Sequence, residues 1–406
     1  MDFSDTPEEA RFRHEAREWL QQNAPKKFKV NDFNPARDMA PFRSWQAKKA
    51  EAGWTCFTWP KEFGGWGGTP IEQVIWSQEE HDLAYLSSPF IIGLGMGGAT
   101  IMMHGSKELQ ERYLRPMVTG DEIWCQLFSE PSAGSDLAGI KTRAVADGDD
   151  WIINGQKLWT SYAQFADFGI LITRTDPSAP KHRGLTYFIV DMKAPGVEVR
   201  PIKMASGDDG FNEVFLSDVR IPDSHRVGPV GGGWKVVLTT LMNERLSVGI
   251  SFLTHFDELF ELASTLFDDS GPLIENRAVR DEIADWFVKS NGLMYTGYRM
   301  MTALSHGHTP GPEASITKLV LARGRQQLAS FVLDLQDQAG ILTDDNGATD
   351  QVNFQKLFFT SIGERIAGGT DEILLNIIGE RVLGLPPDLR IDKDVPFAEV
   401  SSAWPR

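Results

Sequence analysis

The sequence is poor in cysteine, in clustered positive charge and in long apolar runs. Only Cys56 and Cys125 occur among 406 residues, so neither a disulfide framework nor a cysteine-based metal site is expected. The formal net charge is −16 and no basic run occurs, which argues against nucleic acid and anionic membrane surfaces as partners. No apolar run reaches the roughly 20 residues that a membrane-spanning helix needs.

The first residues also lack the features of a targeting segment. The opening MDFSDTPEEARFRHEAREWLQQ carries acids throughout and has no apolar core, so neither a signal peptide nor a transit peptide is expected. The chain is 41% apolar and long enough for more than one domain, which predicts a globular protein. We expect it in a reducing compartment, the cytoplasm, with no metal site.

The pattern of apolar residues changes twice along the chain. Residues 1–120 carry apolar residues three and four apart, as in EEARFRHEAREWL and SKELQERYLRPM, which predicts helices. Short β-prone runs then predict a β domain over 121–230, with a hairpin turn at Asn154-Gly155. The third domain, 231–406, has helical patterns to about residue 384 and ends in a Pro-rich, polar tail over 385–406. This tail is either an arm around a partner or loose.

One glycine pattern can be interpreted in two ways. GLGMGGA matches G-x-G-x-x-G through Gly93, Gly95 and Gly98. A dinucleotide site would need a strand before this pattern, a helix after it and an acid about 20 residues further on. The preceding PFII is a poor strand and the surrounding pattern is helical. Close helix packing or a loop is therefore the favoured interpretation.

The most specific motifs begin at WCQLFSEPSAGSDLAGIKTRA, residues 124–144, and continue in NGQKLWTSYAQFADFGILIT. Together with the closing GGTDEI and GERVLG, they follow the order found in the acyl-CoA dehydrogenase family of flavoproteins, which the chain resembles over nearly its whole length. The resemblance implies an α+β, mostly α fold with an N-terminal helical domain, a middle β-barrel domain and a C-terminal four-helix bundle. It also implies FAD between the β domain and the bundle, usually across a subunit interface.

The resemblance also assigns cofactor-binding positions. Gln126, Leu127, Phe128 and Ser129 match the segment that lines the flavin ring, and Ser135 matches a residue that contacts both the flavin phosphate and the CoA arm. The other matching positions are Trp159, Thr160, Ser161, Thr370 and Glu372. In the family, the last two of these contact the FAD of a neighbouring subunit. Taken singly, these residues are also typical of turns and cores.

The glutamate that usually serves the family as general base is missing. The family typically reads Y-E-G-T where this chain has Ala367-Gly368-Gly369-Thr370. The resemblance implies that the Gly368 N–H still donates to the thioester carbonyl, which is oxyanion-hole chemistry, and that Gly369 is a substrate-binding position. The alternative is a plain turn before a helix capped by Thr370.

Glu244 is the candidate for the missing base. Val237, Leu241, Glu244 and Val248 fall on one helical stripe, and no neighbour three or four residues away can pair with the carboxylate. An unpaired carboxylate on an apolar face should titrate high, as a base for a weakly acidic α-proton requires. A salt bridge between domains or subunits is the alternative. Isovaleryl-CoA and long-chain acyl-CoA dehydrogenases place their base here, before an arginine, and this chain reads Glu244-Arg245, which makes Arg245 a candidate substrate contact.

The resemblance implies oxidation of an acyl-CoA to a 2-enoyl-CoA, with an electron-transferring flavoprotein as electron acceptor. Two departures concern the adenosine half of the FAD site. Phe267 and two acids stand where an arginine is frequent, and Asp337 stands where a glutamine is usual. The protein is therefore expected to be a homo-oligomer or a heteromer with a paralogous subunit. A non-catalytic or half-site subunit and a flavin oxidase or monooxygenase are the alternatives.

Overall fold

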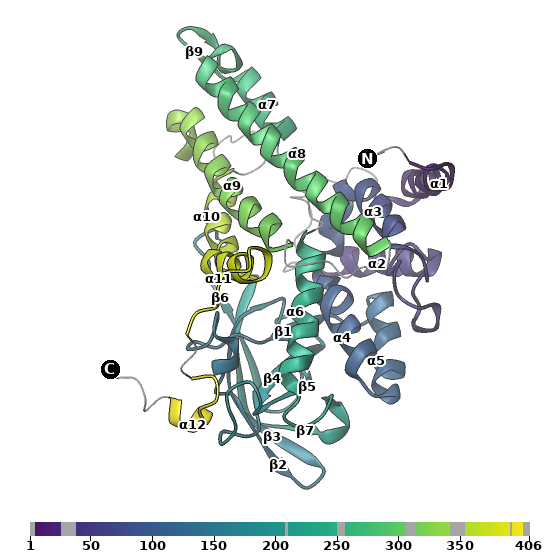
Figure 1. Cartoon of the computed structure of the whole chain (residues 1–406). Coiled ribbons are helices and arrows are strands. Elements are labelled where there is room, and N and C mark those ends of the chain that lie inside the picture. The colour runs from purple at the N-terminus through teal and green to yellow at the C-terminus, as the bar shows by residue number, and fades with distance from the viewer. Residues whose placement is uncertain are drawn as a thin grey trace. The chain divides into compact units, whose positions relative to one another are not determined.

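The computed structural model of the chain describes residues 5–25, 38–207, 210–249, 256–305, 314–341, 354–389 and 392–400. The chain forms two compact units (Figure 1). The first comprises Met1–Lys203, Asp209–Ser247 and Leu389–Arg406, and the second comprises Met204–Asp208 and Val248–Asp388.

Helices form the N-terminal part of the first unit, as the sequence predicts. They are α1 Pro7–Asn23, α2 Ala40–Ala52, α3 Pro70–Glu79, α4 Gly98–His104 and α5 Lys107–Thr119, with shorter helical turns at Lys61–Phe63, His81–Phe90 and Gly93–Gly97. Thr6 and Thr69 start α1 and α3 through capping boxes with Glu9 and Glu72. The helices enclose a core rich in aromatic rings, which includes Trp45, Trp54, Phe57 and Trp76.

The glycine pattern at residues 93–98 serves helix packing, so that interpretation is confirmed. Gly93–Gly97 is a π-helical turn that leads into α4. A Cβ on Gly98 would lie 2.1 Å from Cη2 of Trp59, and a Cβ on Gly93 would contact Trp124. Helical turns precede the pattern, so the strand that a dinucleotide site requires is not there.

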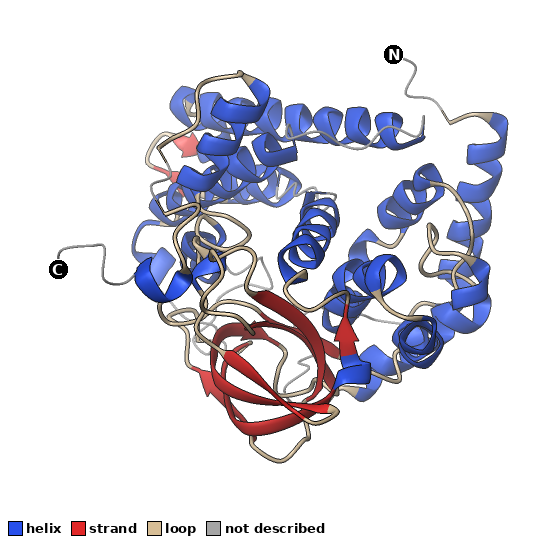
Figure 2. Cartoon of the chain, turned by 60° about the horizontal axis from the view of Figure 1, so that its bottom comes forward, coloured by secondary structure: helices blue, strands red, loops and turns tan. Residues whose placement is uncertain are grey.

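A strongly curled, barrel-like sheet forms the middle of the first unit (Figure 2). Its strands are β1 Trp124–Leu127, β2 Arg143–Asp147, β3 Asp150–Ser161, β4 Phe168–Arg174, β5 Leu185–Asp191, β6 Val197–Ile202, β7 Phe211–Pro222 and β8 Arg226–Val227. The order is β6-β7-β3-β2-β4-β5-β8, and β1 pairs in parallel with β4. One face of the sheet closes over an apolar core that includes Ile153, Phe188, Val214 and Val219.

The predicted hairpin turn at Asn154-Gly155 is wrong, because β3 runs through both residues and the turn lies between β2 and β3. Asn154 Nδ2 donates to Asp218 Oδ1 at 2.9 Å, and the Asp218 N–H donates to Asn154 Oδ1 at 3.0 Å. A Cβ on Gly155 would lie 2.2 Å from Thr142 Oγ1. The glycine is therefore needed for the close approach of Thr142, the residue before β2, rather than for a turn.

Helix α6, Gly233–Gly249, packs its first half on the core of the first unit. Val236 and Val237 are buried there, and the Thr240 hydroxyl lies 3.0 Å from the Tyr187 hydroxyl and 2.9 Å from that of Thr100. Residues 392–400 of the C-terminal tail, which contain α12 Phe397–Val400, pack against other parts of the first unit. This part of the tail is docked rather than loose, whereas residues 385–389 are exposed.

The second unit is a four-helix bundle built from α7 Phe256–Thr265, α8 Arg277–Ser305, α9 Ala314–Leu335 and α10 Phe354–Glu364. Each of the four helices contributes to one apolar core. Smaller elements complete the unit: β9 Phe267–Asp268, β10 Gly271–Pro272, helical turns at Leu273–Glu275, Asp337–Ile341 and Ile378–Val382, and α11 Asp371–Ile377.

The expected fold class is confirmed by this combination of helices, curled sheet and helical bundle. The domain boundaries near residues 120 and 230 stay a prediction. Within the described ranges no single helix is long and apolar enough to cross a membrane, although the bent pair His81–Phe90 and Gly93–His104 passes that test by length and composition.

Candidate functional site

A buried ion pair holds the end of β1 against β3. Lys157 Nζ lies 2.9 Å from Glu130 Oε1, and the two side chains are 0% and 5% exposed. Lys157 also donates to the Phe128 carbonyl at 3.0 Å, while Glu130 accepts from the N–H groups of Lys141 at 2.6 Å and Thr142 at 2.9 Å. Burial alone would raise the pKa of Glu130, but Lys157 and these N–H groups lower it below its ordinary value.

Strand β3 carries a bulge directly after Lys157. Its register against β7 shifts between Lys157 and Thr160, and Trp159 has a φ of 59°, which a bulky residue rarely adopts. The indole is 54% exposed, with the Phe211 ring edge-on at 6.0 Å. Trp159 is therefore not a core residue. Strain and exposure at one tryptophan make Trp159 a candidate ligand contact, and that role stays a prediction.

Polar groups lie beside the bulge. The carbonyl of the half-buried Ser129 accepts from the Leu158 N–H at 2.9 Å. Thr160 Oγ1 and Asn212 Oδ1 are buried and have no hydrogen-bond partner within the described residues, while Asn212 Nδ2 donates to the Thr160 carbonyl at 3.1 Å. Ser161 is half-buried. The exposed ring and the half-buried Ser129 and Ser161 could contact a planar ligand with hydrogen-bonding edges, such as a flavin.

Gln126 of β1 and Glu244 of α6, which are 118 positions apart, meet through a hydrogen bond. Gln126 Nε2 donates to Glu244 Oε2 at 3.3 Å, and both side chains are half-buried. Glu244 follows Val237 and Thr240 along the buried side of α6, whereas Leu238 is 49% exposed. The apolar face is thus confirmed, but the prediction of an unpaired carboxylate is wrong, because its partner comes from a strand that helical spacing does not reveal.

Ser135 lies near the tip of an exposed loop. The neighbouring Asp136 accepts from Lys181 Nζ at 3.0 Å through both carboxylate oxygens. Beneath the loop, Arg174 is 4% exposed and donates to the Ala138 carbonyl at 2.5 Å. Burial lowers the pKa of Arg174 to about 10. The buried Arg174 and the half-buried Lys181 therefore hold the loop in place, while Ser135 stays exposed.

In the second unit, Gly368 and Gly369 form a turn before α11. Their φ values are 61° and 96°, in the left-handed region that glycine adopts readily. Thr370 Oγ1 accepts a backbone N–H of the first turn at 3.2 Å, so the expected N-cap is confirmed. Lys318 Nζ donates to the Gly369 carbonyl at 2.6 Å, and Glu372 is exposed.

Asp371 anchors this turn and was missed by sequence reasoning. It is 3% exposed and accepts from Arg323 at 2.9 Å and from Arg365 at 2.6 Å. Burial alone would raise the pKa of Asp371, but the two guanidinium groups lower it overall. An acid in the first turn is visible in the sequence, whereas the arginine on α9 that meets it is not.

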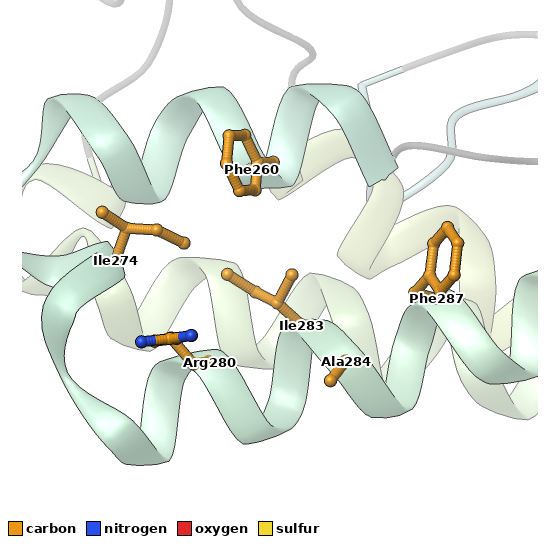
Figure 3. A pocket seen from close by; sticks show the side chains of 6 residues that line it. All are labelled: Phe260, Ile274, Arg280, Ile283, Ala284 and Phe287. Atoms are coloured by element: carbon orange, nitrogen blue, oxygen red, sulfur yellow. The ribbon is translucent and has the colours of Figure 1, made fainter.

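A separate apolar hollow of about 270 Å³ lies in the second unit between α7 and α8 (Figure 3). Its lining is Phe260, Ile274, Arg280, Ile283, Ala284 and Phe287. Phe260 and Phe287 are 48% and 49% exposed. The predicted site residues do not contribute to it, so it is a surface feature of the bundle rather than part of the candidate site.

The predicted site residues divide between the two units. The first unit brings together Gln126, Leu127, Phe128, Ser129, Trp159, Thr160, Ser161 and Glu244, with Ser135 on the supported loop. The second unit holds Gly368, Gly369, Thr370 and Glu372. The side chains of Arg245 and Val248 lie outside the described residues. The catalytic and binding roles of all these residues stay predictions.

Comparison with known sequences identifies relatives of the whole chain. Three family models match in chain order: acyl-CoA dehydrogenase, N-terminal domain over residues 6–121, middle domain over 125–219 and C-terminal domain over 231–383. Acyl-CoA dehydrogenase FadE34 of Mycobacterium tuberculosis is 37% identical over 348 residues, which cover 85% of this chain and 47% of that protein. Acyl-CoA dehydrogenase IpdE1 of Mycolicibacterium smegmatis is 36% identical over 410 residues, which cover 93% of this chain and 98% of that protein.

Chains of solved structures are similar to this chain as well. The ChsE4-ChsE5 complex from Mycobacterium tuberculosis contains a chain with a TM-score of 0.82 and 29% identity, covering 96% of this chain and 100% of that one. A chain of the Tcur3481-Tcur3483 steroid ACAD has a TM-score of 0.80 and 27% identity, with coverage of 96% and 100%. The present chain thus spans about half of FadE34 and nearly all of IpdE1. Because three domain models match in order and relatives above 30% identity span most of the chain, the protein belongs to the acyl-CoA dehydrogenase family, whose members are FAD-dependent oxidoreductases.

Proposed function

We propose that the protein oxidises an acyl-CoA thioester to a 2-enoyl-CoA, with Glu244 as the base that removes the α-proton. The observation that carries this proposal is the carboxylate on the buried side of α6, held by Gln126 at the end of β1. Partial burial keeps water away from the carboxylate, and the Gln126 amide fixes the direction of one of its oxygens. A base that is oriented and partly desolvated suits a weakly acidic carbon.

FAD, when bound, would supply the acceptor for the β-hydrogen. The bulge residues Trp159 to Ser161 and the segment from Gln126 to Ser129 would hold the flavin ring, and Ser135 would contact a phosphate. Two features of the first unit support this assignment: the strained and exposed indole, and the end of β1 that Lys157 holds in place. On the second unit, the Gly368 N–H would donate to the thioester carbonyl, while Thr370 and Glu372 would contact the cofactor of another subunit.

The substitution Glu244→Gln tests the base. We expect flavin content to be retained and the rate of flavin reduction by substrate to fall at least about a hundredfold, the usual scale for loss of a general base. Glu198→Gln is the matched control, because Glu198 is a 59% exposed carboxylate on β6. A near-normal rate of flavin reduction by substrate in Glu244→Gln would show that another group removes the α-proton.

A ring-bearing acyl group is the substrate class that we propose to test first. The support is twofold: a similar solved structure is named a steroid ACAD, and Gly368 carries no side chain where the family usually has a glutamate. The experiment is an anaerobic titration with steroid-derived and straight-chain CoA thioesters, followed by flavin bleaching. Faster bleaching by the straight-chain thioesters would contradict the proposed class.

We further propose that the functional particle is a complex with a second acyl-CoA dehydrogenase chain, reoxidised by an electron-transferring flavoprotein in the cytoplasm. The similar solved structures are named as pairs of components, and the bundle exposes large apolar side chains that include Phe287, Val288, Ile362 and Ile366. Phe267, 70% exposed, stands where an arginine is frequent in the family, which also favours a half-site subunit. A colourless protein that becomes yellow when a paralogue is co-expressed would support that version.

A further inference from the structure

The C-terminal segment 392–400 docks on the loop 176–183 of the first unit. Figure 1 shows its short helix α12 beside the strands of the sheet. The N–H groups of Phe397 and Ala398 donate to carbonyls of the loop at 3.0 and 2.9 Å. An isolated β-bridge joins Pro396 to the same loop. Backbone pairing of this kind fixes the segment in one register.

One lysine connects this segment to the loop that carries Ser135. Lys181 Nζ lies 2.6 Å from Asp392 Oδ2 and 3.0 Å from both carboxylate oxygens of Asp136. The Lys181 side chain is only 12% exposed, whereas that of Asp136 is 60% exposed. Burial alone would lower the pKa of Lys181, but the two carboxylates raise it overall. Asp392 is thus joined to the residue next to Ser135 through one ammonium group.

The Phe397 ring provides a second contact between the C-terminal segment and the residues that hold the Ser135 loop. The Arg174 Cζ atom lies 3.5 Å from the centroid of that ring. Arg174 donates to the carbonyls of Ala138, behind the Ser135 loop, and of Lys181, at 2.5 and 3.2 Å. A desolvated guanidinium gains substantially from an aromatic face. Removing the ring would therefore loosen the cation that supports the loop.

We propose that the segment 392–400 is a clasp that fixes the Ser135 loop for a ligand carrying an adenine-nucleotide phosphate, with Lys181 and Phe397 as positioning residues. Asp392, at one end of the segment, holds the tip of the loop through Lys181, and Phe397 holds its base through Arg174. The clasp rests on these contacts alone. The inference that Ser135 contacts a phosphate depends on the proposed function, and this phosphate would belong either to FAD or to the CoA thioester.

Two substitutions in the full-length, flavin-loaded protein test the clasp. Asp392→Asn removes the charge that holds Lys181, and Phe397→Leu removes the ring while keeping an apolar side chain. Asp394→Asn is the matched control, because Asp394 is an exposed carboxylate two positions further on. Hydrogen exchange is measured at the amides of Gly139 and Ile140, whose hydrogen bonds close the end of the loop. We expect exchange about three- to tenfold faster in both variants and unchanged exchange in the control.

Two binding measurements identify the ligand. A higher dissociation constant for FAD, followed by flavin fluorescence, assigns the phosphate to the cofactor. A higher KM for an acyl-CoA at unchanged kcat assigns it to the thioester. Unchanged exchange in both variants would overturn the clasp. Faster exchange with both constants unchanged would overturn the phosphate site at Ser135. Wild-type protein that binds neither FAD nor acyl-CoA would refute the proposed function, and the exchange rates would still test the clasp.

Discussion

The substitution Lys157→Met removes a buried ammonium group while keeping an unbranched side chain of similar reach. The Lys157 side chain is 0% exposed and lies 2.9 Å from Glu130, whose carboxylate is 5% exposed. After the substitution the carboxylate keeps the N–H groups of Lys141 and Thr142 as donors but has lost its counter-charge. The Phe128 carbonyl also loses the donor that holds it at 3.0 Å.

Breaking a buried pair in this way costs about 3 to 5 kcal/mol of unfolding free energy. Because two N–H groups still satisfy the carboxylate, we expect a loss near 3 kcal/mol. With a denaturant slope of about 2 kcal/mol per molar urea, the urea midpoint falls by roughly 1.5 M. The bound flavin should be lost as well, since Lys157 fixes the segment that ends at Ser129.

The loss of unfolding free energy in Lys157→Met should depend on pH. In the wild type the folded-state pKa of Glu130 is lowered, so its stabilising contribution is present above the ordinary value of about 4.3 and is lost as the pH falls through the folded value. In Lys157→Met, burial without a counter-charge raises that pKa, so the ionised carboxylate destabilises the fold increasingly above about pH 4.3. Burial lowers the pKa of Lys157 to about 8, so the comparison is made below that value. The difference between variant and wild type should be larger at pH 6.5 than at pH 4.

The assay is urea unfolding at both pH values, with two further variants. Lys193→Met removes an ion pair to Asp167 in which the lysine side chain is 74% exposed, and should cost less than about 1 kcal/mol. The double variant Lys157→Met/Glu130→Gln removes the uncompensated charge and should recover part of the lost stability. A Lys157→Met protein as stable as Lys193→Met at both pH values would refute this account of the pair.

Three other predictions concern the site and the assembly. Introducing Gly368→Glu into Glu244→Gln should restore part of the lost rate, since the family resemblance assigns both positions to the base that removes the α-proton; a folded, flavin-loaded double variant without rescue at any pH would contradict this. Gln126→Leu should move the acid limb of the pH–rate profile to higher pH, because a donated hydrogen bond favours the ionised carboxylate, and an unmoved limb would argue against a positioning role for Gln126. Mass measurement in solution should show at least a dimer, and a flavin-loaded monomer would disprove a site shared between subunits.

Local sequence patterns were sufficient for much of the fold. Apolar spacing predicted the N-terminal helices, β-prone runs predicted the strands, and the Gly-Gly-Thr pattern predicted the cap at Thr370. The Asn154-Gly155 pair was misinterpreted because glycine serves close approach as well as turns. In β3 the space is filled by Thr142 of another segment, which spacing along one strand cannot reveal.

The candidate site was only partly predictable, because its contacts join distant segments. Family motifs identified Glu244 and Gln126 separately, yet their hydrogen bond spans 118 positions. The link from Asp392 to Lys181 spans 211 positions. Helical spacing and turn residues report on neighbours within a few positions, so such pairs require the folded chain.

The bulge at Trp159 has a consequence for the balance between stability and activity. A bulky residue at positive φ, with more than half of its surface in water, weakens the fold before any ligand arrives. Under the proposed function, the indole already stands exposed before FAD binds, so that a flavin would not have to reshape the strand. Such a conformation lowers stability, so a substitution at Trp159 that relaxes the bulge is expected to stabilise the protein while it weakens the proposed flavin site.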